Sequence, residues 1–355
     1  MSGLLVKRDD LREVRLDEPE TPVPEAGQAV LAVKAFGMTA NNVTYAVMGD
    51  VMSYWDFFPV DEEGWGRLPT WGFAEVEASD AEGVEVGDRY YGYWPSASHL
   101  LVTPRVGGER GFVDASPHRA ELPSAYHRYL RTDSDPFHST SSEDLQMLLR
   151  PLFFTSFLAD DQLADEGLAT GGPVMMASAS SKTALAAAFM LAQRDGVELV
   201  ALTSERNVEF VDGLGIYART VPYSEIGSLE REPATFVDFA GNGEVRAAVH
   251  QRFGDDLRHS MAVGVTHWED FEGGADMPGP APKFFFAPTR VTKRVEDWGA
   301  VGLEERVAEA WGPFCEWCSG WLEVDHAEGW EAAREAYLDV LEGRVPPSRA
   351  TVLRV

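Results

Sequence analysis

The chain has 355 residues, a formal net charge of −28 at pH 7 and 45% hydrophobic residues. This length predicts two domains with sizeable hydrophobic cores. The negative charge opposes binding to nucleic acid or to an anionic membrane, because both partners need a basic surface. No apolar run has the length of a membrane span, and residues 1–7 lead directly into charged sequence instead of a signal peptide. We therefore expect a soluble, cytoplasmic protein.

The N-terminal part is predicted to be rich in β-strands. Residues 28–36 alternate in part between apolar and polar, and residues 73–78 alternate strictly, which is typical of a half-buried strand. Residues 105–148 are polar, with clusters of Gly, Pro, Ser, Asp and His. For that segment we expect an irregular, extended excursion with one or two short helices.

A strand, a turn of small residues and a helix follow in the middle of the chain. Residues 174–177 are apolar, residues 178–183 form the turn, and residues 184–194 are rich in Ala, Leu, Phe and Met. A second apolar strand at 198–203 completes a right-handed β-α-β unit. In a dinucleotide site, the turn and the helix N-terminus of such a unit hold the pyrophosphate.

Strands and helices continue to alternate, which predicts an α/β fold with a parallel sheet covered on both faces. The further predicted strands are 220–223, 234–239, 260–264 and 283–288, followed by helices at 303–323 and 329–341 and a strand at 350–355.

The turn lacks the glycines that such sites normally have. Small residues, Ser178, Ser181 and Ala184, occupy those positions. Serine is small and can donate a hydrogen bond to phosphate, but it does not tolerate positive φ as glycine does. Lys182 could pair with a phosphate as a point charge. We expect Ser178, Ser180, Ser181, Lys182 and Thr183 to bind a cofactor; the alternative is a turn that has lost its cofactor.

The residues after the second strand indicate which cofactor binds. A NAD site usually has an acidic residue there for the ribose 2′-hydroxyl. Here Ser204 and Arg206 offer a hydroxyl and a guanidinium, which suit a 2′-phosphate better, while Glu205 leaves NAD open. We expect NADP.

Motifs in a fixed order along nearly the whole chain carry a family resemblance. They are 27–37 with Asn41-Asn42, 86–92, 178–184, 210–215 with 221–223, and 237–241. The chain resembles the medium-chain dehydrogenase/reductase superfamily, in its zinc-independent quinone oxidoreductase and enoyl reductase branch. Residues 42–49, 54–59 and 178–184 are similar to a bacterial subgroup of that branch.

The resemblance implies a GroES-like β-rich domain, formed by 1–150 and 286–355, and a Rossmann-type nucleotide-binding domain, formed by 151–285. It also implies that Tyr223, Gly241 and Phe286 contribute to the cofactor site, and that the chain forms a homodimer through residues 271–280.

The resemblance further implies that the residues after the first long strand face the nicotinamide. Asn42, Tyr45 and Tyr54 are therefore the candidate catalytic residues, opposite the turn at 178–183. A tyrosine there can donate a proton or hold a carbonyl oxygen. The alternative is that these tyrosines only pack, because 54–58 is an aromatic cluster.

We expect no metal. The superfamily's zinc-dependent members supply cysteine from the N-terminal domain, and this chain has none before Cys315. The pair Cys315 and Cys318 lies in a helical pattern with tryptophans, which favours packing over metal or redox chemistry.

These observations predict an NADP-dependent, zinc-independent reductase of a carbonyl or activated C=C in a largely apolar small molecule. The alternative is a non-redox small-molecule binding protein, or a cofactor-independent lyase, with a decayed cofactor turn.

Overall fold

The computed structural model describes residues 2–18, 20–108, 110–239, 241–263 and 277–355. The chain divides into two compact units, Met1–Arg150 with Leu322–Val355, and Pro151–Trp321. We call them the first and second unit. The units divide at 150/151, and the roles assigned to the two predicted domains remain predictions. The sequence analysis placed residues 286–321 in the first domain, whereas they belong to the second unit. Within that unit, Phe314 stacks on Phe153 with ring centroids 4.8 Å apart.

The first unit is built on two β-sheets. The larger has the order β17-β18-β3-β5-β6-β10-β9-β8, with β7 also paired to β3, and the smaller has the order β2-β1-β4. The strands are β1 Gly3–Lys7, β2 Val14–Asp17, β3 Ala29–Met38, β4 Trp65–Arg67, β5 Pro69–Ser79, β6 Arg89–Pro95, β7 His99–Val102, β8 Pro104–Val106, β9 Gly111–Asp114, β10 Arg128–Arg131, β17 Glu323–Glu328 and β18 Arg349–Arg354.

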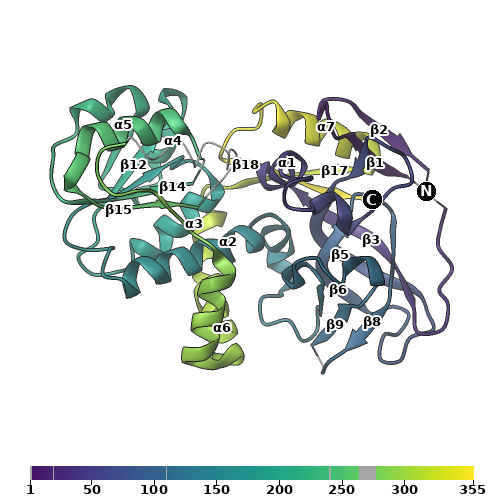
Figure 1. Cartoon of the computed structure of the whole chain (residues 1–355). Helices are drawn as coiled ribbons and strands as arrows, with labels where there is room; N and C mark the ends of the chain where they lie inside the picture. The colour runs from purple at the N-terminus through teal and green to yellow at the C-terminus, as the bar shows by residue number, and fades with distance from the viewer. Residues whose placement is uncertain (1, 19, 109, 240, 264–276) are drawn as a thin grey trace. The chain divides into compact units, whose positions relative to one another are not determined.

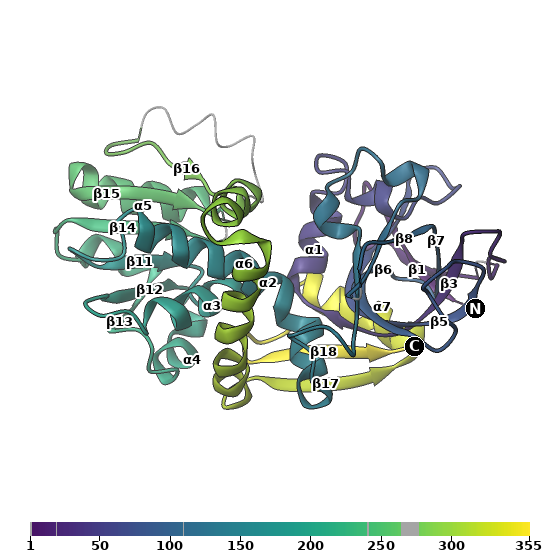
Figure 2. The same cartoon turned by 90° about the horizontal axis from the view of Figure 1, so that it is seen from below.

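Short helices connect these strands. They are α1 Ala40–Val47, η1 Tyr54–Phe57, η2 Pro117–Arg119, η3 Ser124–Tyr126, η4 Thr140–Ser142 and α7 Gly329–Leu341, where η denotes a 3-10 helix. Helix α2, Glu143–Asp165, begins in this unit and ends in the second. The C-terminal strands β17 and β18 lie side by side as a parallel pair, and β18 continues antiparallel onto β3 (Figure 2).

The polar segment 105–148 is more regular than its composition predicts. It contains β9 and β10, which extend the larger sheet. Phe112 and Tyr129, from these two strands, are buried and stack with ring centroids 5.0 Å apart. This buried aromatic face stabilises strands too short to be recognised from alternation, so the predicted irregular insertion is a sheet extension.

The second unit contains a parallel sheet with the order β13-β12-β11-β14-β15-β16 (Figure 1). The strands are β11 Val174–Ala177, β12 Leu199–Thr203, β13 Arg219–Pro222, β14 Ala234–Asp238, β15 Leu257–Ala262 and β16 Lys283–Phe284; the helices are α3 Lys182–Leu191, η5 Glu205–Asn207, α4 Val208–Gly213, η6 Tyr223–Ser228, α5 Gly243–Phe253, η7 Gly254–Asp256 and α6 Ala287–Ser319.

The strand order of this sheet reverses between β11 and β14, which is the topological switch point where doubly wound sheets bind ligands. Buried side chains cover both of its faces. Val200, Leu202 and Phe236 pack with α5 and η6, and Ala201 packs with Val211 of α4. The predicted α/β class with a parallel sheet is confirmed.

Two boundaries near the end of the second unit differ from prediction. The strand predicted at 283–288 is only the two-residue β16, because Pro288 lies in the first turn of α6, where proline favours a helix start. Helix α6 is longer than predicted and is kinked at Gly299, whose φ is 76°. The predicted dimer segment 271–280 lies mostly outside the described residues. No helix in the described ranges is long and apolar enough to cross a membrane.

Candidate functional site

The turn between β11 and α3 has the strand–turn–helix form that the sequence predicts. Ser178 adopts the left-handed conformation, with φ of 56°. Ser181 is the N-cap of α3, and its hydroxyl accepts a hydrogen bond from the backbone N–H of Ala184 at 3.3 Å. The first-turn N–H groups of an α-helix have no intrahelical acceptor, so the start of α3 offers donors to an anion.

Side chains from the short helices η5 and η6, which follow the neighbouring strands β12 and β13, hold this turn in place. The Ser178 N–H donates to the Tyr223 hydroxyl at 3.1 Å, and Asn207 Nδ2 donates to the Ser180 hydroxyl at 2.9 Å. Burial raises the pKa of Tyr223, so the phenol is neutral. Two groups predicted to bind the cofactor, the Ser178 backbone and the Ser180 side chain, therefore already have partners within the chain.

Lys182 and Thr183 make contacts with other helices. Burial lowers the pKa of Lys182 to about 8, and the nearby Cys318 of α6 partly offsets that shift. The Thr183 carbonyl accepts a hydrogen bond from the Ser156 hydroxyl of α2 at 2.7 Å. A contact of Lys182 with phosphate remains a prediction.

The 3-10 helix η5, directly after β12, carries an exposed arginine. Arg206 forms no ion pair with any residue in the described part of the chain. Ser204 precedes η5 without a side-chain capping bond. Glu205, in contrast, accepts a hydrogen bond from the Ser224 hydroxyl at 2.6 Å, which lowers its pKa. The donor set of a hydroxyl and an unpaired guanidinium fits a phosphate ester better than a ribose hydroxyl.

Gly241 and Phe286 lie after β14 and β16 of the same sheet. Gly241 has φ of 70°, and its N–H donates to Asp238 Oδ1 at 2.9 Å. Phe286 is 51% exposed, and its ring centroid lies 6.3 Å from that of Phe284. Because carboxyl ends of parallel strands share one sheet edge, both residues lie on the edge that carries the 178–181 turn. Their cofactor contacts remain predictions.

A second candidate site lies within the first unit. We call Tyr45, Tyr54, Tyr93 and Tyr126 the tyrosine cluster; they come from α1, η1, β6 and η3. Ring centroids are 4.7 Å apart for Tyr45 and Tyr54, 5.3 Å for Tyr45 and Tyr93, and 4.7 Å for Tyr93 and Tyr126. Tyr54 and Tyr126 are half-buried, whereas Tyr45 and Tyr93 are buried. The cluster therefore extends from the surface of the unit into its core.

Tyr45 accepts two hydrogen bonds. Asn41 Nδ2 and Trp71 Nε1 both donate to its hydroxyl oxygen at 2.8 Å. Burial raises the pKa of Tyr45, so the phenol keeps its proton at neutral pH. In both hydrogen bonds the Tyr45 oxygen is the acceptor, so the Tyr45 hydroxyl can still donate its proton in a hydrogen bond to another group.

Sequence reasoning missed Tyr93. Its hydroxyl is buried and has no hydrogen-bond partner among the described residues. Burial, and then the nearby Tyr45, Tyr126 and Tyr54 hydroxyls, raise its pKa. An unsatisfied buried hydroxyl costs about 1–3 kcal/mol, so it needs an explanation. The aromatic pattern of residues 91–95 marked the strand, but nothing in it distinguished this hydroxyl.

Asn42, a candidate catalytic residue, makes structural hydrogen bonds with both ends of its amide, and its catalytic role remains a prediction. Its Oδ1 accepts the Thr39 N–H at 2.8 Å in a capping box at the start of α1. Its Nδ2 donates to the Pro69 carbonyl at 3.0 Å. Because both ends of the amide are occupied, the neighbouring Asn41 is the asparagine that reaches Tyr45.

The two cysteines lie in α6 among aromatic rings. Both thiols are buried, and burial raises the pKa of Cys315 to about 12. In the described ranges, no three His, Cys, Asp or Glu side chains form a group that could hold a metal ion. The expected absence of a metal remains a prediction.

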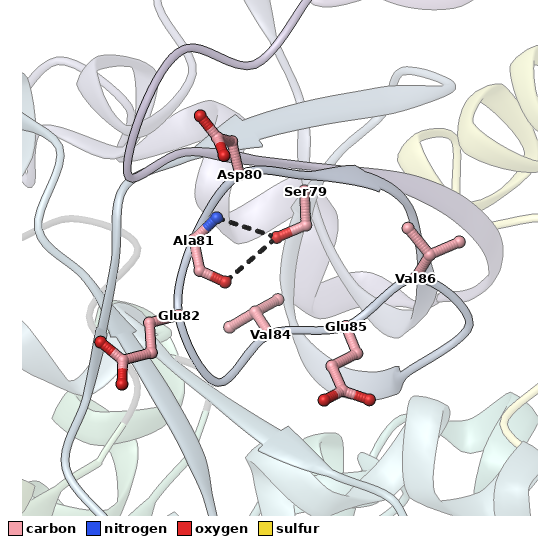
Figure 3. A pocket seen from close by; sticks show the side chains of 7 residues that line it. All are labelled: Ser79, Asp80, Ala81, Glu82, Val84, Glu85 and Val86. Atoms are coloured by element: carbon pink, nitrogen blue, oxygen red, sulfur yellow. Dashed lines mark hydrogen bonds between the residues drawn. The ribbon is translucent and has the colours of Figure 1, made fainter.

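A shallow hollow lies at the turn between β5 and β6 (Figure 3). There the Ser79 hydroxyl donates a hydrogen bond to the Ala81 carbonyl and accepts one from the Ala81 N–H. The carboxylates of Asp80, Glu82 and Glu85 spread outward in different directions. They do not converge on one point, so this hollow lacks the arrangement of a ligand site.

Backbone strain coincides with the two candidate sites. Ser53 and Ser178 are the non-glycine residues with positive φ in the described part of the chain, both at 56°. Ser53 precedes Tyr54 of the tyrosine cluster, and Ser178 opens the turn before α3. Strained backbone of this kind is often found at functional sites.

Solved structures share this fold. CurA from Vibrio vulnificus has a TM-score of 0.61 and 16% identity, covering 100% of this chain and 99% of that chain. The CurK enoyl reductase has a TM-score of 0.56 and 17% identity, covering 99% and 98%. The yhdH oxidoreductase from Salmonella enterica, in complex with NADP, has a TM-score of 0.55 and 16% identity, covering 100% of both chains.

At these sequence identities the likeness shows the fold alone, a β-rich GroES-like domain with a Rossmann-type domain. No curated protein matches the sequence. One family model, described as "Protein of unknown function (DUF2855)", matches residues 36–346, and the chain therefore belongs to that family.

Proposed function

We propose that this protein is an NADPH-dependent, zinc-independent reductase that acts on a carbonyl or an activated C=C of a largely apolar small molecule. The observation that carries the proposal is Arg206 in η5, directly after β12, which has no ion-pair partner among the described residues and lies one strand away from the turn before α3. Structures of this fold support it: CurA was solved in complex with NADPH and yhdH in complex with NADP.

The residues of the second unit fit such a cofactor in two places. Ser204 and Arg206 would bind the 2′-phosphate, through a hydroxyl and a charge-assisted guanidinium contact. The turn at 178–181 and the start of α3 would bind the pyrophosphate through backbone N–H groups. Bound NADPH supplies a hydride.

The tyrosine cluster would bind the polar end of the substrate. Tyr45 is neutral, because burial raises its pKa, and its proton is not donated to any described residue. It can therefore donate a hydrogen bond or a proton to a substrate oxygen. Bonds from Asn41 and Trp71 would stabilise the phenolate after proton transfer.

Titration of the purified protein with NADPH and NADH, followed by fluorescence, tests the cofactor. The wild type is expected to bind NADPH more tightly than NADH. Arg206→Ala should weaken NADPH binding roughly ten- to a hundredfold and leave NADH binding unchanged, because only NADPH has the 2′-phosphate. Equal affinity of the wild type for both cofactors would contradict the assignment.

Arg219→Ala is the matched control for that variant. Arg219 is also an exposed arginine of the second unit, but it lies at the amino end of β13, paired with Val200 at the start of β12. It is therefore at the opposite edge of the sheet from Arg206, and its loss should not change NADPH binding. An equal effect of both variants would indicate a general charge effect instead of a phosphate contact.

A non-redox binding protein or a cofactor-independent lyase is the second candidate. It is favoured by the internal bonds of the turn, because Tyr223 and Asn207 already occupy the Ser178 N–H and the Ser180 hydroxyl. Failure of both NADPH and NADH to bind would support this candidate.

A further inference from the structure

His99, at the start of β7 in the first unit, is hydrogen-bonded to a serine through one ring nitrogen and to a carboxylate through the other. Its Nδ1 lies 2.9 Å from the Ser98 hydroxyl, and its Nε2 lies 2.7 Å from Glu77 Oε2. Because a carboxylate only accepts hydrogen bonds, the Nε2–H of the neutral ring donates to Glu77 and Nδ1 carries the lone pair. The Ser98 hydroxyl therefore donates to Nδ1.

This order of groups is that of an activated nucleophile. A serine hydroxyl is a weak nucleophile until a base takes its proton, and a third group that fixes the tautomer and orientation of the base completes the arrangement. In the described part of the chain, His99 is the one histidine hydrogen-bonded to both a serine and a carboxylate. The Ser98 backbone is also fixed, because its N–H donates to the Ser2 carbonyl and its carbonyl accepts the Val33 N–H.

Ser98 and His99 line a cavity of about 460 Å³, which is within the size range of small-molecule sites. The apolar part of its wall includes Phe57, Phe58, Pro59, Pro95 and Leu100. Arg67 also lines the cavity, but its guanidinium is paired with Asp17, so its charge is already compensated. All the lining residues belong to the first unit. The cavity therefore suits a neutral, largely apolar ligand.

From these features we infer that Ser98, His99 and Glu77 form a second active site, which hydrolyses neutral carboxylic esters with an apolar acyl group. Ser98 is the nucleophile and His99 the general base, whereas Glu77 acts through His99 and is a positioning residue. This activity goes beyond the proposed reductase and needs no dinucleotide, because nucleophile, base and cavity all lie in the first unit.

The reaction has two steps. Ser98 Oγ attacks the acyl carbon while its proton moves to His99 Nδ1; the bond from that carbon to the alcohol oxygen then breaks, and the departing oxygen takes the proton from Nδ1. The acyl group is now an ester of Ser98. Water attacks this ester and gives a proton to Nδ1, which passes it to Ser98 Oγ as the carboxylic acid leaves.

An alkyl fluorophosphonate tests the nucleophile directly, because an activated serine displaces its fluoride and stays covalently phosphonylated. We expect the wild type to gain one phosphonyl group, mapped to Ser98 by mass spectrometry of its peptides, and to hydrolyse 4-nitrophenyl butyrate. Ser98→Ala should lose the label. His99→Gln should label and hydrolyse at least about a hundredfold more slowly, because the general base is removed.

Glu77→Gln tests the positioning role. Glutamine keeps the size of the side chain but removes the charge that stabilises the protonated His99 ring. We expect kcat for 4-nitrophenyl butyrate to fall about tenfold or more with little change in KM, because Glu77 acts on the base and does not touch the ester. A raised KM with unchanged kcat would contradict the assignment of Glu77.

Ser260→Ala is the matched control. The Ser260 hydroxyl also lies 2.9 Å from a histidine nitrogen, Nε2 of His250, but the other nitrogen of that ring faces the Pro278 carbonyl instead of a carboxylate. Ser260 is also buried, so the probe does not reach it. The variant, with its folding checked by urea unfolding, should be labelled at Ser98 and hydrolyse the ester as the wild type does.

A wild type that takes no label, a label on another residue, or equal labelling of the wild type and Ser98→Ala would overturn the inference. If Ser98→Ala does not fold, His99→Gln decides with the expectation given above. Failure of ester hydrolysis with intact NADPH binding would refute only this second active site. Failure of NADPH binding with intact ester hydrolysis would refute only the proposed reductase.

Discussion

The Tyr223 hydroxyl holds the backbone N–H of Ser178 at 3.1 Å, at a turn where Ser178 is in the left-handed conformation. A serine in this conformation costs about 1 kcal/mol or more, because its Cβ crowds the backbone. The bond from η6 is part of what maintains that conformation. The fold therefore keeps a glycine-like turn without glycine.

Replacing Ser178 with Gly and with Ala separates the strain from the loss of the hydroxyl. Both variants lose the hydroxyl, but only Gly adopts φ of 56° without strain. We expect Ser178→Gly to be more stable than Ser178→Ala by about 1 kcal/mol in urea unfolding. The same pair at Ser180, which is not a positive-φ position, should show the reverse order. Equal stability of the two Ser178 variants would argue against strain.

Asp161 is expected to be a major stabilising residue of the second unit. It accepts hydrogen bonds from Arg290 Nε at 2.5 Å and from Arg294 Nε at 2.7 Å, and all three residues are buried. Asp161→Asn removes the charge that pairs both guanidinium groups. The free energy of unfolding should fall by about 3 kcal/mol, at the low end for a broken buried pair, because Asp165 still pairs with both arginines.

Asp297→Asn is the control for that change. Asp297 also pairs with Arg294, but its side chain is 36% exposed. Solvent screens such a pair, so the loss should be below about 1 kcal/mol. The free energy of unfolding of both variants is measured in urea. Comparable losses would show that burial does not determine how much each ion pair contributes to stability.

His250 should make the protein less stable at acidic pH. Its Nδ1 lies 2.9 Å from the Pro278 carbonyl and its Nε2 2.9 Å from the Ser260 hydroxyl, so the neutral ring donates to one and accepts from the other. Burial lowers its pKa below the usual 6.5. The unfolded chain then binds a proton that the folded chain does not, and stability is lost as pH falls below 6.5 toward the folded pKa.

The test is to compare urea unfolding of the wild type and His250→Gln at about pH 8 and about pH 5. Glutamine can donate and accept as the neutral ring does, but it does not titrate. The variant should lose less stability between the two conditions. Part of the loss should remain, because burial also lowers the pKa of His127 and His259. An unchanged pH dependence would exclude His250 as a contributor.

The sequence predicted the elements whose signals are local. Residues 174–203 contain two apolar strands around an alanine-rich helix, and the structure has β11, α3 and β12 there. Helix α7, 329–341, was predicted with its observed bounds. In contrast, β9 and β10 are too short for a periodic pattern, and their stability comes from stacking between Phe112 and Tyr129, which are 17 residues apart in the chain.

The candidate sites divide in the same way. The residue types at 178–183 and 204–206 predicted a phosphate site, because residue type and spacing can be read directly from the sequence. The hydrogen-bond partners of these residues could not be predicted from the sequence. Tyr223 accepts a hydrogen bond from Ser178, 45 residues away, and Trp71 donates one to Tyr45, 26 residues away. The hydrogen bond from Asn42 to the Pro69 carbonyl, 27 residues away, likewise cannot be predicted from the helix pattern.

The amino-acid sequence by itself determined the α/β class, the β-α-β unit and the chemistry available at Ser204 and Arg206, since hydrophobic period and residue type act locally. Tertiary structure decided which polar groups remain available. It brought Tyr93 among three other tyrosines. Within the described ranges it left the Tyr93 hydroxyl without a hydrogen-bond partner and Arg206 without an ion pair, while Glu205 accepts a hydrogen bond from Ser224. Whether a polar group is available to a ligand depends on which other groups long-range packing brings within hydrogen-bond distance. The amino-acid sequence does not give those distances.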